Sequence, residues 1–256
     1  MPVMPAVDTL WLTWPTYLTD PALLLRLHAL LDEAEQRTAD GRRVPEDRRA
    51  YLAAHALLRL ALARQGGAPP GSWRFRHNPY GRPEVALPEG SGLRFSISHT
   101  RSLVACLLVT EGEVGLDVER IGRVADPHGL ATRFFAPAEA RWLATSPAPL
   151  VPWRFTALWT LKEAYVKARG RGLSLPVDQC CFTLDEAGRI TAQLDPRLGD
   201  EAHRWRFALG APDPAHLLAI ARAPAGTRPI RCREVVPTER EQEVPLRWLA
   251  TSAPVG

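Results

Sequence analysis

Residues 159–170 read Trp159-Thr-Leu-Lys162-Glu163-Ala-Tyr165-Val-Lys167-Ala-Arg-Gly170, which combines a helical pattern with charged side chains on one flank. Apolar side chains recur at steps of three and four residues, the period of an amphipathic helix: Leu158, Leu161, Tyr165 and Ala168. Gly170 is a typical end for such a helix. Trp159, Glu163 and Lys167 lie four residues apart and therefore share one flank.

Lysine usage makes this helix unusual. Lys162 and Lys167 are the only lysines, and the remaining 30 of the 32 basic residues are arginines. An ammonium is a compact point charge, whereas a guanidinium is a planar fork, so the two are not interchangeable. Taken alone, however, the helix could equally be a surface helix with a Glu163–Lys167 ion pair worth a few tenths of a kcal/mol.

A second informative segment lies upstream, at Val114-Gly115-Leu-Asp117-Val-Glu119. Its strict alternation predicts a strand with Gly115, Asp117 and Glu119 on one face. Two carboxylates so close repel each other, and a divalent cation with oxygen ligands would relieve the repulsion. Gly115 would leave room on that face for a ligand to approach the backbone. A solvated edge strand with two acidic residues explains the segment alone equally well.

Together the two segments are far more specific. Gly-Leu-Asp-Val-Glu followed by Trp-Thr-Leu-Lys-Glu-Ala-Tyr-Val-Lys resembles the signature of the 4′-phosphopantetheinyl transferases, in their larger, Sfp-like branch. Four further blocks resemble the family, so that the similarity spans roughly residues 46–222: Tyr80-Gly-Arg82-Pro83, Phe95-Ser-Ile-Ser98-His99, Ala131 to Glu139, and Gly170 to Leu173. At Ser96 the family frequently has Asn.

The resemblance implies an α+β fold, a pseudo-dimer of two similar halves. Each half would be a small antiparallel sheet packed with helices, and the active site would lie between the halves. We expect an N-terminal half at 1–112 for the nucleotide side of coenzyme A. A C-terminal half at 113–236 would hold magnesium and pyrophosphate and dock the carrier protein. Residues 237–256 are charged and then rich in Pro and Ala, and we expect a partly disordered tail.

The implied reaction moves 4′-phosphopantetheine from coenzyme A to a serine of an apo acyl or peptidyl carrier protein and releases 3′,5′-ADP. Asp117, Glu119 and Glu163 would hold Mg²⁺. Asp117, Glu163 and Lys167 would be catalytic, with Glu163 as the base, directly or through water. The expected coenzyme A contacts are Arg49 (or Arg48), Arg82, Ser98, His99, Lys162 and Lys167. The pathway implied is secondary metabolite biosynthesis.

Composition sets the broad class. The net charge of +4 and pI of about 9.1 suit polyanionic ligands or an acidic partner. No Lys/Arg-rich run with interleaved aromatic residues indicates nucleic-acid binding. The four cysteines lack metal-ligand spacing. No signal peptide or membrane-spanning run is evident. We expect a cytoplasmic monomer that does not bind membranes.

Local patterns predict the remaining elements. Helices are expected from Pro21, over 46–65, from Pro127 and from Pro137. Strands are expected at 9–14, 73–76, 93–98, 103–110, 181–184, 189–193, 204–209 and 216–221. Glu111-Gly-Glu113 would form a hairpin turn between the strand at 103–110 and the strand with Asp117. His99 would then lie two strands away from the carboxylates, at one end of the same cleft.

Two other functions remain compatible with parts of the sequence. One is a carrier- or nucleotide-binding scaffold without catalytic activity, and the intact carboxylate set argues against it. The other is a carboxylate–metal phosphodiesterase or nuclease, which also needs clustered Asp and Glu. The blocks around Arg82 and Ser98-His99 argue against hydrolysis, which does not require them.

Overall fold

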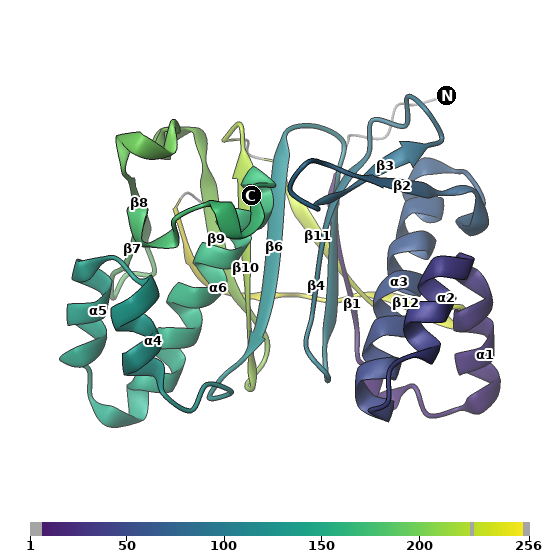
Figure 1. Ribbon diagram of the computed structural model, residues 1–256, viewed down its shortest axis with the longest axis horizontal. Helices are drawn as coiled ribbons and strands as arrows, with labels where there is room; N and C mark the ends of the chain where they lie inside the picture. The colour runs from purple at the N-terminus through teal and green to yellow at the C-terminus, as the bar shows by residue number, and fades with distance from the viewer. Residues whose placement is uncertain (1–6, 226–227, 253–256) are drawn as a thin grey trace. The chain divides into compact units, whose positions relative to one another are not determined.

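The computed structural model describes residues 7–225 and 228–252. The described chain divides into two compact units. Unit 1 contains residues 7–78, 83–111 and 228–245, and unit 2 contains residues 79–82, 112–225 and 246–252. Both combine helices with small, mainly antiparallel sheets, so the fold is mixed α+β, as predicted (Figure 1).

Unit 1 is built on a five-stranded sheet in the order β12-β11-β1-β5-β4. Its strands are β1 (Asp8–Thr13), β4 (Arg94–His99), β5 (Val104–Val109), β11 (Ile230–Val236) and β12 (Arg240–Glu243). Only the β1–β11 pair is parallel. The helices α1 (Pro21–Leu30), α2 (Glu33–Asp40) and α3 (Pro45–Gly66) gather on one side of this sheet (Figure 1). A separate hairpin joins β2 (Arg74–His77) and β3 (Pro83–Leu87).

Helix α3 carries much of the unit 1 core. Pro45 opens it with Glu46 and Asp47 in the first turn, where acidic side chains complement the helix dipole. Gly67 closes it at φ +77°, a conformation that favours glycine. Between these ends the helix buries Leu57 and Leu62 against strand residues of the same cluster.

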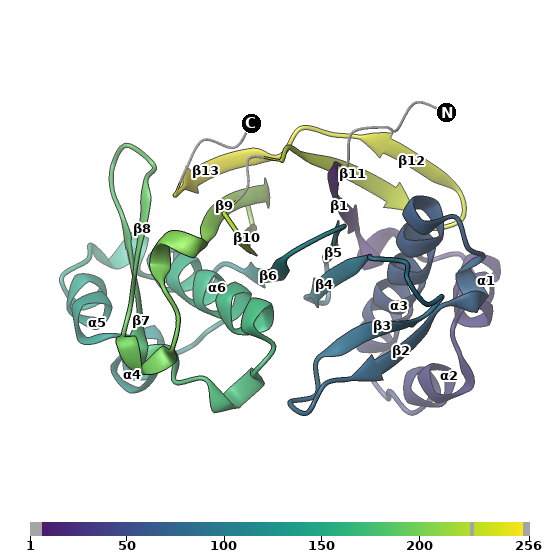
Figure 2. The same ribbon diagram turned by 90° about the horizontal axis from the view of Figure 1, so that it is seen from above.

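Unit 2 is built on a four-stranded antiparallel sheet in the order β13-β9-β10-β6. Its strands are β6 (Glu113–Arg120), β9 (Arg206–Asp213), β10 (His216–Ala223) and β13 (Arg247–Thr251). A second hairpin joins β7 (Cys180–Leu184) and β8 (Ile190–Leu194). The helices are α4 (Pro127–Phe134), α5 (Pro137–Ala144) and α6 (Val151–Arg169). Helix α6 runs along β6, as Figure 2 shows.

The two units repeat one order of elements. Each runs strand, three helices, hairpin, strand, strand: β1 to β5 in unit 1 and β6 to β10 in unit 2. In each, the last strand pairs antiparallel with both the first and the second of the sheet strands, giving β1-β5-β4 and β6-β10-β9. No repeat is visible in the sequence, because different side chains fill the two cores.

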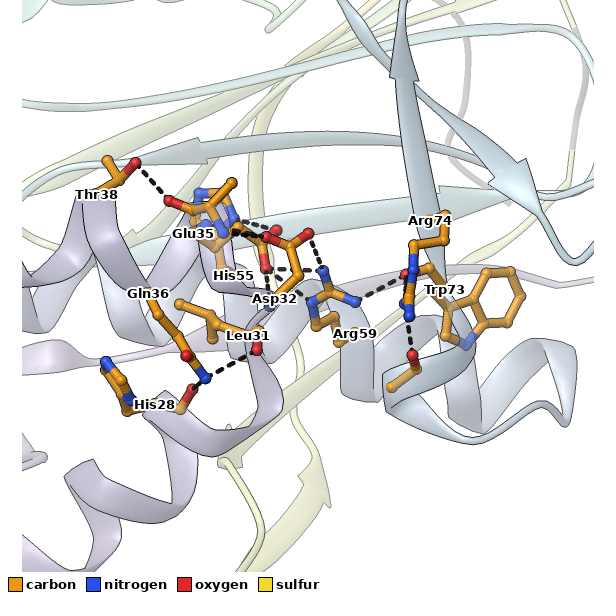
Figure 3. A network of polar contacts seen from close by, with 12 residues as sticks. His28, Leu31, Asp32, Glu35, Gln36, Thr38, His55, Arg59, Trp73 and Arg74 are labelled. Carbon is orange, nitrogen blue, oxygen red and sulfur yellow. Dashed lines mark hydrogen bonds and ion pairs between the residues drawn. The ribbon is translucent and has the colours of Figure 1, made fainter.

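A buried ion pair is repeated as well, first in unit 1 (Figure 3). The Arg59 side chain on α3 is 1% exposed and donates to Glu35 Oε2 from Nε at 3.0 Å and Nη2 at 2.8 Å. Glu35, the third residue of α2, also accepts from the backbone N–H of Asp32. Arg59 Nη1 donates to the carbonyl of Trp73, just before the β2–β3 hairpin. These hydrogen bonds of Arg59, which we call the clasp of unit 1, join α2, α3 and the β2–β3 hairpin.

Unit 2 builds the same clasp with lysine. Lys162 on α6 lies 2.7 Å from Glu139 Oε2, and both side chains are at most 2% exposed. Glu139 is the third residue of α5 and accepts from the backbone N–H of Ala136. Lys162 also donates to the carbonyls of Val177 and Cys180 at the start of the β7–β8 hairpin. In both units, a cation on the long helix therefore holds the preceding short helix and the following hairpin.

Most predicted helices and strands are confirmed, with ends shifted by a few residues. The predicted hairpin at Glu111–Glu113 is wrong. Strand β5 already has β1 and β4 on its two edges, so no edge is left for β6, which pairs with β10. Helix α2 was not predicted separately. The structure also differs from the expected tail, because β12 and β13 lie within residues 237–256.

In the part of the chain that the structure describes, no helix combines the length and apolar character needed to span a bilayer.

Candidate functional site

Strand β6 places its carboxylates against helix α6. Gly115 lies so close to the helix that an added Cβ would stand 1.9 Å from the carbonyl oxygen of Ala164 and 2.4 Å from the amide nitrogen of Ala168. Because side chains alternate along a strand, Asp117 and Glu119 share this helix-facing side. Gly115 was expected to give a ligand access to the backbone. The structure corrects this expectation, because the backbone of α6 fills that space.

Asp117 forms the most buried charge pair of the β6–α6 face. Its side chain is 6% exposed, and Oδ1 accepts a hydrogen bond from Lys167 Nζ at 2.7 Å. Lys167 lies on α6 one turn after Glu163, and its side chain is 32% exposed. The predicted proximity of this lysine to the strand carboxylates is therefore observed.

Glu119 faces a different cation. Arg123 donates to both of its oxygens, from Nε to Oε2 at 3.1 Å and from Nη2 to Oε1 at 3.2 Å. The Glu119 side chain is 18% exposed and that of Arg123 is 62% exposed. Burial raises the pKa of Glu119, the Asp117 charge raises it further, and Arg123 and Lys167 lower it.

Glu163 is the third carboxylate of this face. Among the described residues it has neither a hydrogen-bond nor an ion-pair partner. Burial raises its pKa above the ordinary value, the charges of Asp117 and Glu119 add to this effect, and Lys167 opposes it. A raised pKa makes a half-buried carboxylate a stronger proton acceptor than an ordinary surface carboxylate.

The three carboxylates have the donor chemistry that a hard divalent cation requires. Each influences the pKa of another, so they lie within electrostatic reach of one another. Within the described residues, however, no three His, Cys, Asp or Glu side chains stand as a group that could hold a metal. In the structure, Lys167 and Arg123 are the cations that neutralise Asp117 and Glu119. Asp117, Glu119 and Glu163 fit a cation as oxygen donors, and their side chains would have to converge on it.

Lys162 does not belong to this face. It was predicted to contact coenzyme A, but its side chain is 2% exposed and its ammonium is held by Glu139 and two carbonyls. Since residues 162 and 163 are adjacent on a helix, their side chains point about 100° apart. Lys162 therefore points into the core of unit 2, and we withdraw it as a coenzyme A residue.

Arg82 is tied to the backbone of unit 2. Its Nη1 donates to the carbonyl of Ala168 at 2.7 Å and its Nη2 to that of Val114 at 3.0 Å. These bonds join the end of α6 to the start of β6.

The remaining predicted residues lie in unit 1. Ser98 is buried and His99 exposed at the end of β4, and Arg49 lies in the second turn of α3, 3.5 Å from Glu46. Arg101, two residues beyond His99, forms an ion pair with Asp47 of α3 at 2.7 Å. This pair brings the end of β4 to the beginning of α3, so Arg49, Ser98 and His99 occupy one region of unit 1.

Sequence comparison identifies the family. Residues 113–221 match the model of the 4′-phosphopantetheinyl transferase superfamily. The 4′-phosphopantetheinyl transferase HetI of Nostoc sp. is 31% identical over 219 residues, which cover 84% of this chain and 89% of HetI. The chain belongs to the 4′-phosphopantetheinyl transferase superfamily. The match contains the whole β6–α6 face, whereas Arg49, Arg82, Ser98 and His99 precede it.

Other superfamily members are similarly related. A phosphopantetheinyl transferase of Thraustochytrium sp. is 30% identical and covers 77% of this chain and 71% of its own length. The transferase Sfp of Bacillus subtilis is 30% identical over a region that covers 58% of this chain and 64% of Sfp. Among solved structures, the holo-[acyl-carrier-protein] synthase of Thermotoga maritima matches at 22% identity over 45% of this chain and 64% of its own, with a TM-score of 0.36. That likeness is too low to add to the assignment.

Sequence reasoning missed three charged residues that hold the β6–α6 face or helix α6 in place. Arg123 follows Glu119 by four residues, but no helix there suggests the pairing. Glu139 ends one of the blocks that resemble the family, but nothing in the sequence indicates its ion pair with Lys162. Asp200 is fully buried and accepts from the Tyr165 hydroxyl, Arg169 and the Trp205 indole, which anchors the last turn of α6. Such distant pairs become visible only in three dimensions.

Proposed function

We propose that this chain is a magnesium-dependent 4′-phosphopantetheinyl transferase. It would transfer 4′-phosphopantetheine from coenzyme A to a serine hydroxyl of an apo acyl or peptidyl carrier protein and release 3′,5′-ADP. The observation that carries the proposal is the β6–α6 face, where Asp117, Glu119, Glu163 and Lys167 gather within the superfamily match. Three carboxylates and one partly exposed ammonium suit phosphoryl transfer, which depends on positioning and charge stabilisation.

In this proposal each residue has a defined task. Glu163 takes the proton of the serine hydroxyl. The serine oxygen then bonds to the phosphorus next to pantetheine, while the bond between that phosphorus and the oxygen of the leaving 3′,5′-ADP breaks. Lys167 places its charge beside the phosphates. Asp117, Glu119 and Glu163 would hold Mg²⁺, which would supply charge neutralisation at the pyrophosphate. Asp117 also holds the Lys167 ammonium in place at 2.7 Å.

The coenzyme A contacts are proposed in unit 1 and at Arg82. Arg49 (or Arg48), Ser98 and His99 would bind the 3′-phosphate side, because the Arg101–Asp47 pair gathers this region of α3 and β4. Arg82, which bridges the end of α6 and the start of β6, would contact the same substrate. Coenzyme A and the carrier protein are the only partners proposed.

We also propose that the two units are the halves of a pseudo-dimer, supported by the repeated element order and the repeated clasp. A cytoplasmic monomer is proposed, and the four free cysteines suit a reducing compartment. A role in secondary metabolite biosynthesis rests on the sequence resemblance alone.

The test is the intact mass of several apo carrier proteins after incubation with coenzyme A, Mg²⁺ and this protein. The transferase proposal expects a phosphopantetheine adduct on the carrier serine, absent without Mg²⁺ and with Asp117→Ala. A bound carrier without an adduct would instead support the scaffold alternative. Cleavage of coenzyme A without any carrier adduct would support a phosphodiesterase. Either result would refute transfer.

A further inference from the structure

A tight turn at the end of β6 folds Arg123 back over Glu119. The Arg123 amide donates to the carbonyl of Arg120 at 3.3 Å, and Gly122 adopts φ +76° between them. A residue with a side chain would be strained at this φ, so the glycine favours the turn. Glu119 and Arg123 thus meet across a turn, although they are not on a helix.

The guanidinium covers both oxygens of Glu119. Its two hydrogen bonds, of 3.1 and 3.2 Å, form a bidentate fork. Asp117 is neutralised differently, by the ammonium of Lys167 on α6. Arg123 is 62% exposed, so its guanidinium can rotate into water and be hydrated when it leaves Glu119.

We infer that Arg123 competes with the divalent cation for Glu119 and so lowers the metal affinity of the β6–α6 face. The inference rests on the proposed metal site. An ion bound by Glu119 needs the same oxygen lone pairs that the fork uses, and two cations beside one carboxylate repel each other. The positive charge of Arg123 therefore raises the concentration of divalent cation that is needed to displace the arginine from Glu119.

The experiment measures direct Mn²⁺ binding to the full-length chain by electron paramagnetic resonance of the free ion, without coenzyme A or carrier protein. Arg123→Ala and Arg123→Gln remove the fork. Arg120→Ala is the matched control, because this exposed residue of the same turn carries the same charge. Asp117→Asn serves as the variant expected to lose the site.

We expect Arg123→Ala and Arg123→Gln to bind Mn²⁺ about three- to fivefold more tightly than wild type, which corresponds to the upper part of the energy range of an exposed ion pair. Arg120→Ala should stay within about twofold. Equal or weaker binding by both Arg123 variants, relative to Arg120→Ala, would overturn the inference and indicate that Arg123 orients Glu119 instead. If wild type and every variant fail to bind Mn²⁺ saturably, the metal proposal itself fails and the competition with it.

Discussion

At the scale of the residue, Lys167 is one of two lysines in a chain whose other 30 basic residues are arginines. Its Nζ lies 2.7 Å from Asp117, and its charge also reaches Glu119 and Glu163. A single rotatable point charge can serve several carboxylates and a phosphate in turn. A guanidinium would instead favour one fixed bidentate pose on Asp117.

Lys167→Arg should therefore lower kcat by about tenfold or more, equivalent to about 1.4 kcal/mol in the barrier, with the fold retained. Steady-state transfer measured beside Lys167→Ala, with circular dichroism as the folding control, checks this. A wild-type kcat in the arginine variant would show that only positive charge matters at this position.

His99→Ala should raise the KM for coenzyme A more than it lowers kcat. The reason is that a contact with the nonreacting 3′-phosphate binds substrate and transition state alike. The measurement compares coenzyme A with 3′-dephospho-coenzyme A for wild type and variant. If the variant still discriminates normally between the two substrates, His99 does not contact the 3′-phosphate.

At the scale of the element, the Lys162–Glu139 clasp fixes helix α6 to α5 and to the β7–β8 hairpin. Lys162→Met leaves a buried carboxylate without its cation and should cost about 3–5 kcal/mol of unfolding free energy. Lys162→Met with Glu139→Gln should cost clearly less than the sum of the single changes, as measured by urea unfolding in a double-mutant cycle. Additive losses would contradict the coupling of this pair. A KM for coenzyme A that stays raised in the folded double variant would indicate that Lys162 contacts the substrate.

The sequence predicted the helices, the strands and the residues of the β6–α6 face better than the tertiary contacts around that face. Asp117, Glu119, Glu163 and Lys167 follow local periodicities of two and four, which one strand and one helix realise directly. The role of Gly115 depends on the approach of α6, which no strand pattern encodes. Likewise, adjacent Lys162 and Glu163 look equivalent in sequence, although one faces the core and the other the β6–α6 face.

At the scale of the whole molecule, buried charge sets the response to acid. Burial opposes ionisation of Glu35, but hydrogen bonds from His55, the Asp32 backbone and Arg59 outweigh it and lower the pKa to about 2 from 4.5 (Figure 3). Its stabilisation is therefore complete above pH 4.5 and lost as the pH falls towards 2.

Glu35→Gln should lower the unfolding free energy by about 3 kcal/mol at pH 7, and the difference from wild type should shrink steadily below pH 4.5. Urea unfolding at several pH values, with the exposed Glu33→Gln as control, provides the measurement. A pH-independent difference would mean that Glu35 stabilises through packing and not through its charge.

The path of the last strands has a consequence for synthesis on the ribosome. Strands β11 and β12 belong to unit 1, whereas β13 ends the sheet of unit 2 (Figure 2). Asp8 of β1 pairs with Ile230 of β11, so one edge of β1 waits for a partner that is made more than 200 residues later. At typical elongation rates this wait is roughly 10–45 s. Until β11 is made, the nascent chain therefore carries an unpaired strand edge, which is a site at which chains can aggregate.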